Sequence, residues 1–421
     1  MRAPSPMKRG FYTIMAAQFF SALADNALLV AAMKMLEEQA AAPWLTPHLK
    51  LFFTVSYVVL APFVGAFADS QPKGRVMFIS NGIKIVGCLA MYFGVSPIAA
   101  YAVVGFGAAA YSPAKCGILT ELLPAEQLVV ANGWIEGLTV AAIILGVVTG
   151  GMLIGEDAIL FLQSIDLPGF DTGITSGAQL AIGALAFVYI VAAIINLFVP
   201  LTGVEMRPFL RHPGTMLKEF GHCFLALWRD PYGRISLTVT TLFWGAGATL
   251  QFIVIRWLEI AMGIPLAKAS KLQAVVAVGV ALGAVVAARR LSLKDAVKVV
   301  PVGIFMGLFV ILMIPVKSVA VALVLMVIVG GLGGFFVVPM NALLQHRGHV
   351  LMNAGQSISV QNFNENLSII AMTAGYSALL YAELSIYVII AIFGSFVAGT
   401  MLAVQQMLKH ERKVHGEIPL H

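Results

Sequence analysis

The sequence predicts an all-α membrane protein: twelve transmembrane helices in two pseudo-symmetric six-helix bundles, with both termini in the cytoplasm. Three observations predict this fold. Of the 421 residues, 60% are hydrophobic and only 11% are charged, whereas a soluble domain carries about 25% charged residues. Apolar segments long enough to cross a bilayer recur along the whole chain. The two halves of the chain also share a repeated sequence pattern, as many transporters do.

Twelve apolar segments of about 20 residues, the length that crosses the hydrocarbon core, make up most of the chain. The fifth segment is the least apolar at its start, because Asn132 and Glu136 lie in its first turns. The segments are residues 11–36, 48–68, 76–95, 97–120, 129–154, 178–200, 235–260, 271–288, 296–315, 319–342, 354–381 and 384–408.

The distribution of Lys and Arg between these segments predicts the orientation. With the N-terminus in the cytoplasm, eighteen Lys and Arg residues lie on the cytoplasmic side and five on the outside. The reverse orientation inverts this ratio, so both termini are predicted to be cytoplasmic. The connection 155–177 has four acidic residues and no Lys or Arg, which suits an external loop. No cleavage site follows the first apolar run, so we expect no cleaved signal peptide.

The longest polar connection, residues 201–234, divides the chain. It contains Pro208 and Pro213 and five of the eighteen cytoplasmic cations. Residues 215–227 within it have the pattern of a short amphipathic helix. We therefore expect three parts: an N-terminal six-helix bundle over 1–200, a cytoplasmic linker over 201–234, and a C-terminal bundle with a cytoplasmic tail over 235–421.

The fourth and tenth segments share the pattern Gly-x-Gly-x5-Pro at a constant offset of 226 residues. In this alignment Lys115 of the first half corresponds to Asn341 of the second half. A further match, at an offset of 229, aligns Glu136 with Glu365 in the next segment of each half. Two parallel repeats of six helices are a known plan of secondary transporters. The repeated residues are Gly105, Gly107 and Pro113 in the first half and Gly331, Gly333 and Pro339 in the second.

Lys115 is the most informative single residue. It lies in the stretch Tyr-Ser-Pro-Ala-Lys-Cys-Gly inside an apolar run, close to Pro113, which breaks helix hydrogen bonding. An ionisable residue at membrane depth is costly unless it is paired or lines a wet cavity, so it indicates a functional site. Tyr111 lies one turn earlier on the same face. The alternatives are a lysine that snorkels to the cytoplasmic headgroups and an ion pair with Glu136.

The first segment has a polar stripe. Gln18, Ser21 and Asp25 share one helical face, because they are spaced by three and four residues, and Asn26 follows directly. Asp25 lies near the middle of the bilayer, so we expect it to line a polar cavity. The alternative is an ion pair or hydrogen bond that only holds helices together.

Three further intramembrane charges have simpler interpretations. Lys84 and Glu136 are predicted at a depth similar to that of Lys115, so one Lys–Glu pair is expected among these three residues. Lys84 therefore suits a structural ion pair and a functional site equally well. Arg256 is predicted close to the outer interface, where snorkelling is the favoured interpretation.

The eleventh segment is polar along one stripe. So many amides cannot face lipid, because unsatisfied polar groups in hydrocarbon are expensive. We expect them to line an aqueous cavity together with Asn341 and Gln345, which lie one turn apart on the tenth segment. The alternative is an interhelical polar zipper. The stripe comprises Ser357, Gln361, Asn364, Glu365 and Ser368, and it is widened by Asn362 and Asn366.

Several classes of function lack a sequence signal. The three cysteines are scattered, the histidines fall mostly in loops and tails, and no metal or cofactor site is expected. The net charge of +6 follows from topology, so no nucleic-acid partner is expected. Nothing resembles a Ser-His-Asp arrangement, a P-loop or an HExxH motif, so we predict no enzymatic activity. A membrane acyltransferase would have only His346 and His349, beside Arg347, as cytoplasmic candidates.

The connection after the second segment resembles the signature G-x-x-x-D-x-x-G-R of the major facilitator superfamily. It runs from Gly65 through Asp69 to Gly74 and Arg75, with two extra residues before the Gly-Arg. The resemblance implies the major facilitator fold. It also implies that Asp69 and Arg75 form a cytoplasmic latch, and we group Lys84 and Arg256 with them as gating candidates.

Longer strings resemble one family within it, the bacterial lysophospholipid transporters (LplT), from about residue 11 to residue 380. One departure is Gln251, where the family has an arginine; Arg256, a turn and a half away, is a candidate to compensate. The strings are QFFSALADNALL from Gln18, APFVGAFAD from Ala61, AAAYSPAK from Ala108, LFWGAG from Leu242 and GFFVVPMNALLQ from Gly334.

The resemblance implies a flippase of the bacterial inner membrane. Its members move lysophosphatidylethanolamine and lysophosphatidylglycerol from the outer to the inner leaflet, where an acyltransferase/acyl-carrier-protein synthetase (Aas) reacylates them. We expect alternating access by facilitated diffusion; the alternative is a proton-coupled exporter of drugs or small amphipathic solutes. The candidate substrate-binding residues are Gln18, Asp25, Asn26, Tyr111, Lys115, Glu136, Asn341, Gln345, Gln361, Asn362 and Glu365.

Overall fold

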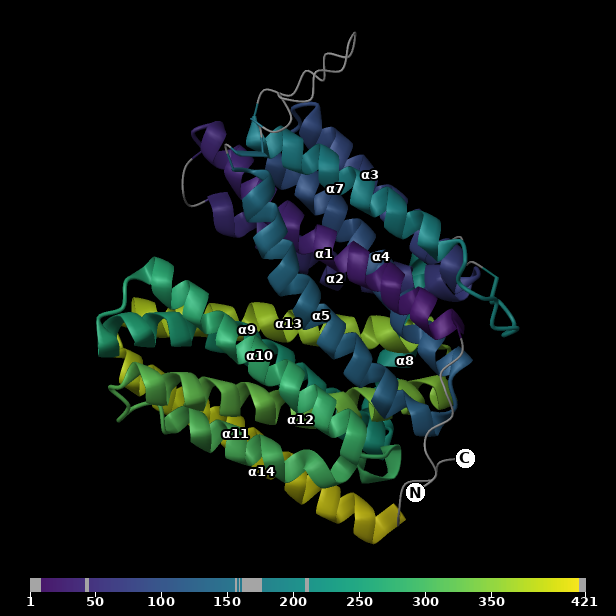
Figure 1. Ribbon diagram of the computed structural model, residues 1–421. Helices are drawn as coiled ribbons and strands as arrows, with labels where there is room; N and C mark the ends of the chain where they lie inside the picture. Colours follow the sequence, from purple (N-terminus) through teal and green to yellow (C-terminus); the bar gives the residue numbers. More distant parts are fainter. Residues whose placement is uncertain are drawn as a thin grey trace. The chain divides into compact units, whose positions relative to one another are not determined.

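The computed structural model describes residues 9–41, 45–155, 157–158, 160, 176–208 and 212–415, and its regular structure there is helical (Figure 1). The predicted all-α fold is confirmed. Most of the predicted external loop 155–177 lies outside the described residues. The helices are α1 (Arg9–Glu38), α2 (Thr46–Asp69), α3 (Lys73–Tyr92), α4 (Pro97–Leu122), η2 (Ala125–Gln127), α5 (Leu128–Leu153), α7 (Gly177–Asn196), α8 (Pro213–Arg229), α9 (Pro231–Met262), α10 (Leu266–Arg290), η3 (Leu293–Val299), α11 (Val300–Ile311), α12 (Val319–Leu351), α13 (Ala354–Tyr381) and α14 (Ile386–His415).

Eleven of the twelve predicted segments each coincide with one α-helix of the described residues, and the segment 296–315 is divided between two helices. Within the described residues, ten helices are long and apolar enough to cross a membrane. The other two predicted segments are too polar or too short to be counted among these ten helices. One is α13, which is 28 residues long but carries the polar stripe. The other is divided between the 3-10 helix η3 and the short helix α11. The chain is therefore a multi-pass membrane protein.

The ends of α9 show how local sequence defines a helix. Asp230 is the N-cap and accepts a hydrogen bond from the Gly233 amide at 2.7 Å, and Pro231 occupies the first turn. Both are preferred at helix starts. Gly263 ends the helix with φ of 63°, a left-handed conformation that glycine adopts without a side-chain clash.

The described residues form two compact units, and each is considered by itself. The first comprises the residues up to Leu122 together with Ala141–Leu217, and the second comprises Leu123–Val140 with the residues from Lys218 onward. The start of α5 thus clusters with the C-terminal helices and its end with the N-terminal helices. The predicted domain boundaries at 200 and 234 stay a prediction.

The N-terminal unit packs α1, α2, α3, α4 and α7 together with the end of α5, and Figure 1 shows α3 and α7 side by side in it. Glycines allow close approach between its helices. A Cβ on Gly107 of α4 would lie 2.7 Å from the Ser80 carbonyl oxygen of α3, and one on Gly146 of α5 would lie 2.6 Å from the Leu23 carbonyl oxygen of α1. These contacts are small-residue interfaces of the kind that membrane helices use.

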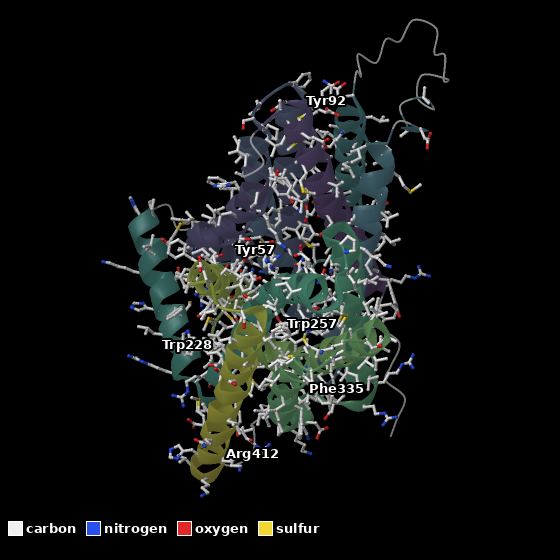
Figure 2. All side chains as sticks on the ribbon, turned by 90° about the vertical axis from the view of Figure 1, so that its left-hand side faces the viewer. Tyr57, Tyr92, Trp228, Trp257, Phe335 and Arg412 are labelled. Carbon is white, nitrogen blue, oxygen red and sulfur yellow. The ribbon has the colours of Figure 1, made fainter. Side chains whose placement is uncertain are left out.

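The C-terminal unit has its densest helix pair in α10 and α12. Gly279 and Gly283 of α10 meet Gly330 and Gly334 of α12 so closely that a Cβ at any of them would overlap the opposite backbone. Trp257 of α9 is fully buried within this unit (Figure 2). Glycines therefore bring α10 and α12 into direct backbone contact.

The predicted amphipathic helix at 215–227 is confirmed as α8. Phe220 and Phe224 pack edge-on against Phe363 of α13, with ring centroids 5.6 and 6.1 Å apart. The opposite face carries exposed residues such as Lys218 and Arg229, and nitrogen-tipped side chains extend outward from this helix in Figure 2.

Candidate functional site

A buried ion pair joins α3 to α1 in the N-terminal unit. Lys84 Nζ donates to both carboxylate oxygens of Asp25, each at 2.8 Å, and to Ser21 Oγ at 3.0 Å. The Lys84 side chain is only 1% exposed, and that of Asp25 is 20% exposed. Tyr189 of α7 donates its hydroxyl to Asp25 Oδ1 at 2.6 Å. Burying both charges is possible because each has its counter-charge and further hydrogen bonds.

Helical spacing explains how these side chains converge. Ser21 and Asp25 lie one turn apart on α1, and Asn81 and Lys84 lie three residues apart on α3. Ser21 Oγ in turn donates to Asn81 Oδ1 at 2.9 Å. Gly107 of α4 has no side chain, so the aliphatic stem of Lys84 packs directly against its backbone.

Aromatic rings surround the Lys84 ammonium. Its Nζ lies 5.2 Å from the ring centroid of Tyr111 and 5.4 Å from that of Tyr189, within cation–π range. The Tyr101 hydroxyl donates to the Asp25 backbone oxygen at 3.3 Å. The charge of Lys84 is therefore satisfied by groups of the protein itself.

Lys115 lies on the wall of a small cavity beside this ion pair. The cavity has a volume of about 50 Å³, and Asp25, Lys84, Tyr111 and Lys115 are among the residues that line it. Lys115 is half-buried. Among the described residues of the N-terminal unit, no hydrogen bond or ion pair of its ammonium is found. Such a volume holds roughly one or two waters, so a larger anion would require the cavity to widen. The full lining is Gln18, Ser21, Ala22, Asp25, Tyr57, Lys84, Ala108, Tyr111, Ser112 and Lys115.

The C-terminal unit contains a polar cluster between α12 and α13. Gln361 Nε2 donates to Asn341 Oδ1 at 3.0 Å and to Glu365 Oε1 at 2.8 Å. All three side chains are buried, and Asn362 beside them is half-buried. These amides form an interhelical hydrogen-bond network, which the sequence left as the alternative to a cavity lining.

The start of α5 is joined to α12 by a reciprocal amide pair. Asn132 Nδ2 donates to Gln345 Oε1 at 2.9 Å, and Gln345 Nε2 donates back to Asn132 Oδ1 at 3.0 Å. Both side chains are nearly fully buried, at 4% and 3% exposure. Glu136 follows one turn later on α5 and is also buried.

The gating candidates occupy different environments. Asp69, at the end of α2, accepts a hydrogen bond from Lys73 Nζ at 2.7 Å, and Lys73 also lies 3.3 Å from Glu121 of α4. Arg75 is exposed, so the buried cation beside Asp69 is Lys73. Lys84 belongs to the ion pair with Asp25. Arg256 pairs with Glu259, its neighbour one turn along α9, at 2.7 Å.

Sequence reasoning missed an ion pair in the C-terminal unit. Arg347 of α12 binds both carboxylate oxygens of Asp230, with its Nε 3.0 Å from Oδ2. The same carboxylate caps α9. The dipeptide Asp230-Pro231 is a helix-start signal, but nothing in the sequence indicates that Arg347 reaches it. Lys73, Tyr189 and Glu121 were missed for the same reason. No group of His, Cys, Asp and Glu suited to a metal ion occurs among the described residues.

Two comparisons with known proteins bear on this arrangement. The sequence pattern of the Major Facilitator Superfamily matches residues 14–373. The lysophospholipid transporter LplT of Yersinia enterocolitica serotype O:8 is 43% identical over 375 residues, which are 89% of this chain and 88% of the relative. LplT of Yersinia pestis is 42% identical over 89% of this chain and 87% of its own length. The chain belongs to the LplT family of the Major Facilitator Superfamily. Both resemblances predicted from the sequence are thereby confirmed.

Solved structures agree with this LplT-family fold. A bacterial homologue of the iron transporter ferroportin, in an outward-facing state, superposes with a TM-score of 0.70 at 15% identity over 96% of this chain and 99% of its own. The human organic anion transporter MFSD10 gives a TM-score of 0.71 at 15% identity, covering 95% of this chain and 100% of its own. At this level of identity the likeness concerns the fold alone.

Within this LplT-family chain the predicted substrate-binding residues fall into two groups. Gln18, Asp25, Tyr111 and Lys115 meet at one cavity of the N-terminal unit. Asn26 lies beside that group, but its amide donates to the Ala22 backbone oxygen at 2.8 Å. The second group belongs to the C-terminal unit and comprises Glu136, Asn341, Gln345, Gln361, Asn362 and Glu365. Their contact with substrate stays a prediction.

Proposed function

We propose that this chain transports lysophospholipids across the bacterial inner membrane, from the outer to the inner leaflet, by alternating access. Lys115 carries the proposal. It is a cation on a cavity wall at membrane depth, and the neighbouring Lys84 is already paired with Asp25. A charge left in this position suits an anionic ligand group. Its relatives of 42–43% identity are named lysophospholipid transporters.

Each of the two groups of candidate residues, considered by itself, suits one part of a lysophospholipid. Its phosphate would pair with the Lys115 ammonium as a point charge. In the C-terminal unit, considered separately, Asn and Gln side chains of α12 and α13 would offer hydrogen bonds to glycerol hydroxyls, and a carboxylate such as Glu365 would meet an ethanolamine ammonium. Few charges on otherwise apolar helices suit an amphipathic ligand better than a sugar, which needs more hydrogen-bonding groups.

In this proposal the protein performs no covalent chemistry. It delivers lysophosphatidylethanolamine and lysophosphatidylglycerol to the inner leaflet, where the acyltransferase/acyl-carrier-protein synthetase (Aas) reacylates them. The partners are thus the substrate, the surrounding lipids and this enzyme as the next step in the sequence. Asp69, Arg75 and Arg256 remain candidates for gating residues.

Reconstitution into vesicles tests the proposal directly. Fluorescent lysophosphatidylethanolamine is placed in the outer leaflet, and its movement inward is followed by back-extraction with albumin. We expect protein-dependent translocation well above that of empty vesicles. Translocation equal to that of empty vesicles would contradict the proposal.

An uncoupler separates facilitated flipping from the proton-coupled alternative. A proton gradient is imposed on the same vesicles and then collapsed. We expect an unchanged rate, because the Asp25 carboxylate already has its counter-charge in Lys84. A rate that falls with the gradient would favour a proton-coupled transporter.

A further inference from the structure

A groove runs between the start of α5 and the end of α10 in the C-terminal unit. Its volume is about 300 Å³, and its lining is almost entirely apolar. Gly133, Trp134 and Gly137 line it from α5, and Val285 and Arg289 line it from α10. None of these residues belongs to the candidate transport site. We call this feature the α5–α10 groove.

Two glycines form the floor of the α5–α10 groove. Gly133 and Gly137 lie one turn apart on α5. A Cβ on Gly133 would lie 2.5 Å from the Ala288 Cβ, so α5 and α10 touch at this point. A Cβ on Gly137 would meet no atom within 4 Å. The two helices therefore touch beside Gly133 and leave open space beside Gly137.

Apolar side chains of the α5–α10 groove are exposed. Trp134 is 49% exposed and Val285 is 41% exposed, although both helices are candidate membrane spans. In a spanning helix an exposed apolar face contacts acyl chains, because hydrocarbon replaces water at that depth. An acyl chain is therefore the occupant that the surroundings supply.

The polar end of the groove identifies the rest of the ligand. Arg289 is exposed in the last turn of α10, which the positive-inside distribution predicts to be cytoplasmic. Trp134, in the first turns of α5, suits the interface between hydrocarbon and headgroups. A cation at this depth attracts the phosphate of anionic lipids of the cytoplasmic leaflet.

We propose that the α5–α10 groove binds an anionic glycerophospholipid of the cytoplasmic leaflet. One acyl chain lies on the glycine floor beside Trp134, and the phosphate contacts Arg289. Its volume lies at the low end of small-molecule pockets, roughly 300–1,000 Å³, so the groove takes one acyl chain while the rest of the lipid stays in the bilayer. This inference does not depend on the proposed transport function.

Quenching of tryptophan fluorescence tests the site in the purified, detergent-solubilised full chain. Phosphatidylglycerol with brominated acyl chains is titrated, and the signal of Trp134 is isolated as the difference from Trp134→Phe. We expect quenching that saturates. Arg289→Gln should raise the half-saturating concentration about fivefold, the effect of one cation near a membrane surface. Arg290→Gln is the matched control, since Arg290 does not line the groove.

A variant that fills the α5–α10 groove provides a second test of lipid binding. Gly137→Leu has open space for its first side-chain atom and should remove the saturable quenching. Gly399→Leu on α14 is its control, because a Cβ there also meets no atom within 4 Å; size-exclusion profiles check the folding of both. Quenching that rises without saturation and is equal in Gly137→Leu would overturn the site. Equal half-saturation in Arg289→Gln and Arg290→Gln, or with brominated phosphatidylethanolamine, would overturn the phosphate contact.

Discussion

Lys84 Nζ lies 2.8 Å from each carboxylate oxygen of Asp25, across the contact between α3 and α1. The pair satisfies two of the few charges that the sequence places within the membrane. It thereby distinguishes the two lysines of this region, since Lys115 lines the adjoining cavity and makes no ion pair with the described residues of its unit.

Asp25→Asn should be strongly destabilising, because it leaves the Lys84 ammonium buried without its counter-charge. We expect a loss of about 3–5 kcal/mol in the free energy of unfolding. The double variant Asp25→Asn/Lys84→Met removes both charges and should recover most of that loss. Denaturant unfolding of the detergent-solubilised variants measures the coupling, and strictly additive losses would argue against the ion pair.

Lys73 should contribute far more to stability than Arg75. The Lys73 side chain is 6% exposed and lies between the carboxylates of Asp69 and Glu121. Lys73→Met would remove the ammonium that contacts both buried carboxylates and should cost about 3–5 kcal/mol. Arg75→Met, on an exposed residue, should change stability by less than about 0.5 kcal/mol. Thermal unfolding compares the two, and similar shifts in Tm would contradict this assignment.

For the Asn132–Gln345 pair we also expect stability losses that are not additive in a double-mutant cycle. Asn132→Leu or Gln345→Leu alone leaves a buried amide unsatisfied and should cost about 1–3 kcal/mol. The double leucine variant removes both polar groups and should be closer to the wild type. Unfolding free energies of the four proteins test this; a double variant as unstable as the sum of the two single variants would show that the amides do not interact.

Much of the fold could be predicted from the sequence, because a bilayer restricts the possible structures. Each spanning segment must be about 20 apolar residues long and satisfy its own backbone. Even α13, whose polar stripe hides it from a hydropathy criterion, is predicted by its length and its place in the repeat. The break between η3 and α11 was not predicted, although Pro301 in the first turn of α11 is a helix-start signal.

The charged residues of the candidate site could be predicted from the sequence, but their ion-pair partners could not. The sequence shows that Asp25, Lys84 and Lys115 are costly in a membrane, but pairing depends on how each helix is rotated against its neighbours. The expected Lys–Glu pair was therefore wrong for Lys84, whose partner is Asp25. In the loop after α2, the family signature drew attention to Arg75. The buried cation beside Asp69 is Lys73, which the turn between α2 and α3 brings to it.

The transport assay on Lys115 variants tests the central claim most directly. Lysophosphatidylethanolamine translocation is measured in vesicles containing equal amounts of wild type, Lys115→Ala, Lys115→Arg and Lys34→Ala. Lys34 is a matched control, since it is a partly exposed lysine of α1 outside the cavity. We expect Lys115→Ala to lower the rate at least tenfold, the effect of losing about 1.4 kcal/mol of phosphate binding in the transition state. Lys115→Arg should retain part of the rate, and Lys34→Ala all of it. A Lys115→Ala rate equal to that of the wild type would contradict the account.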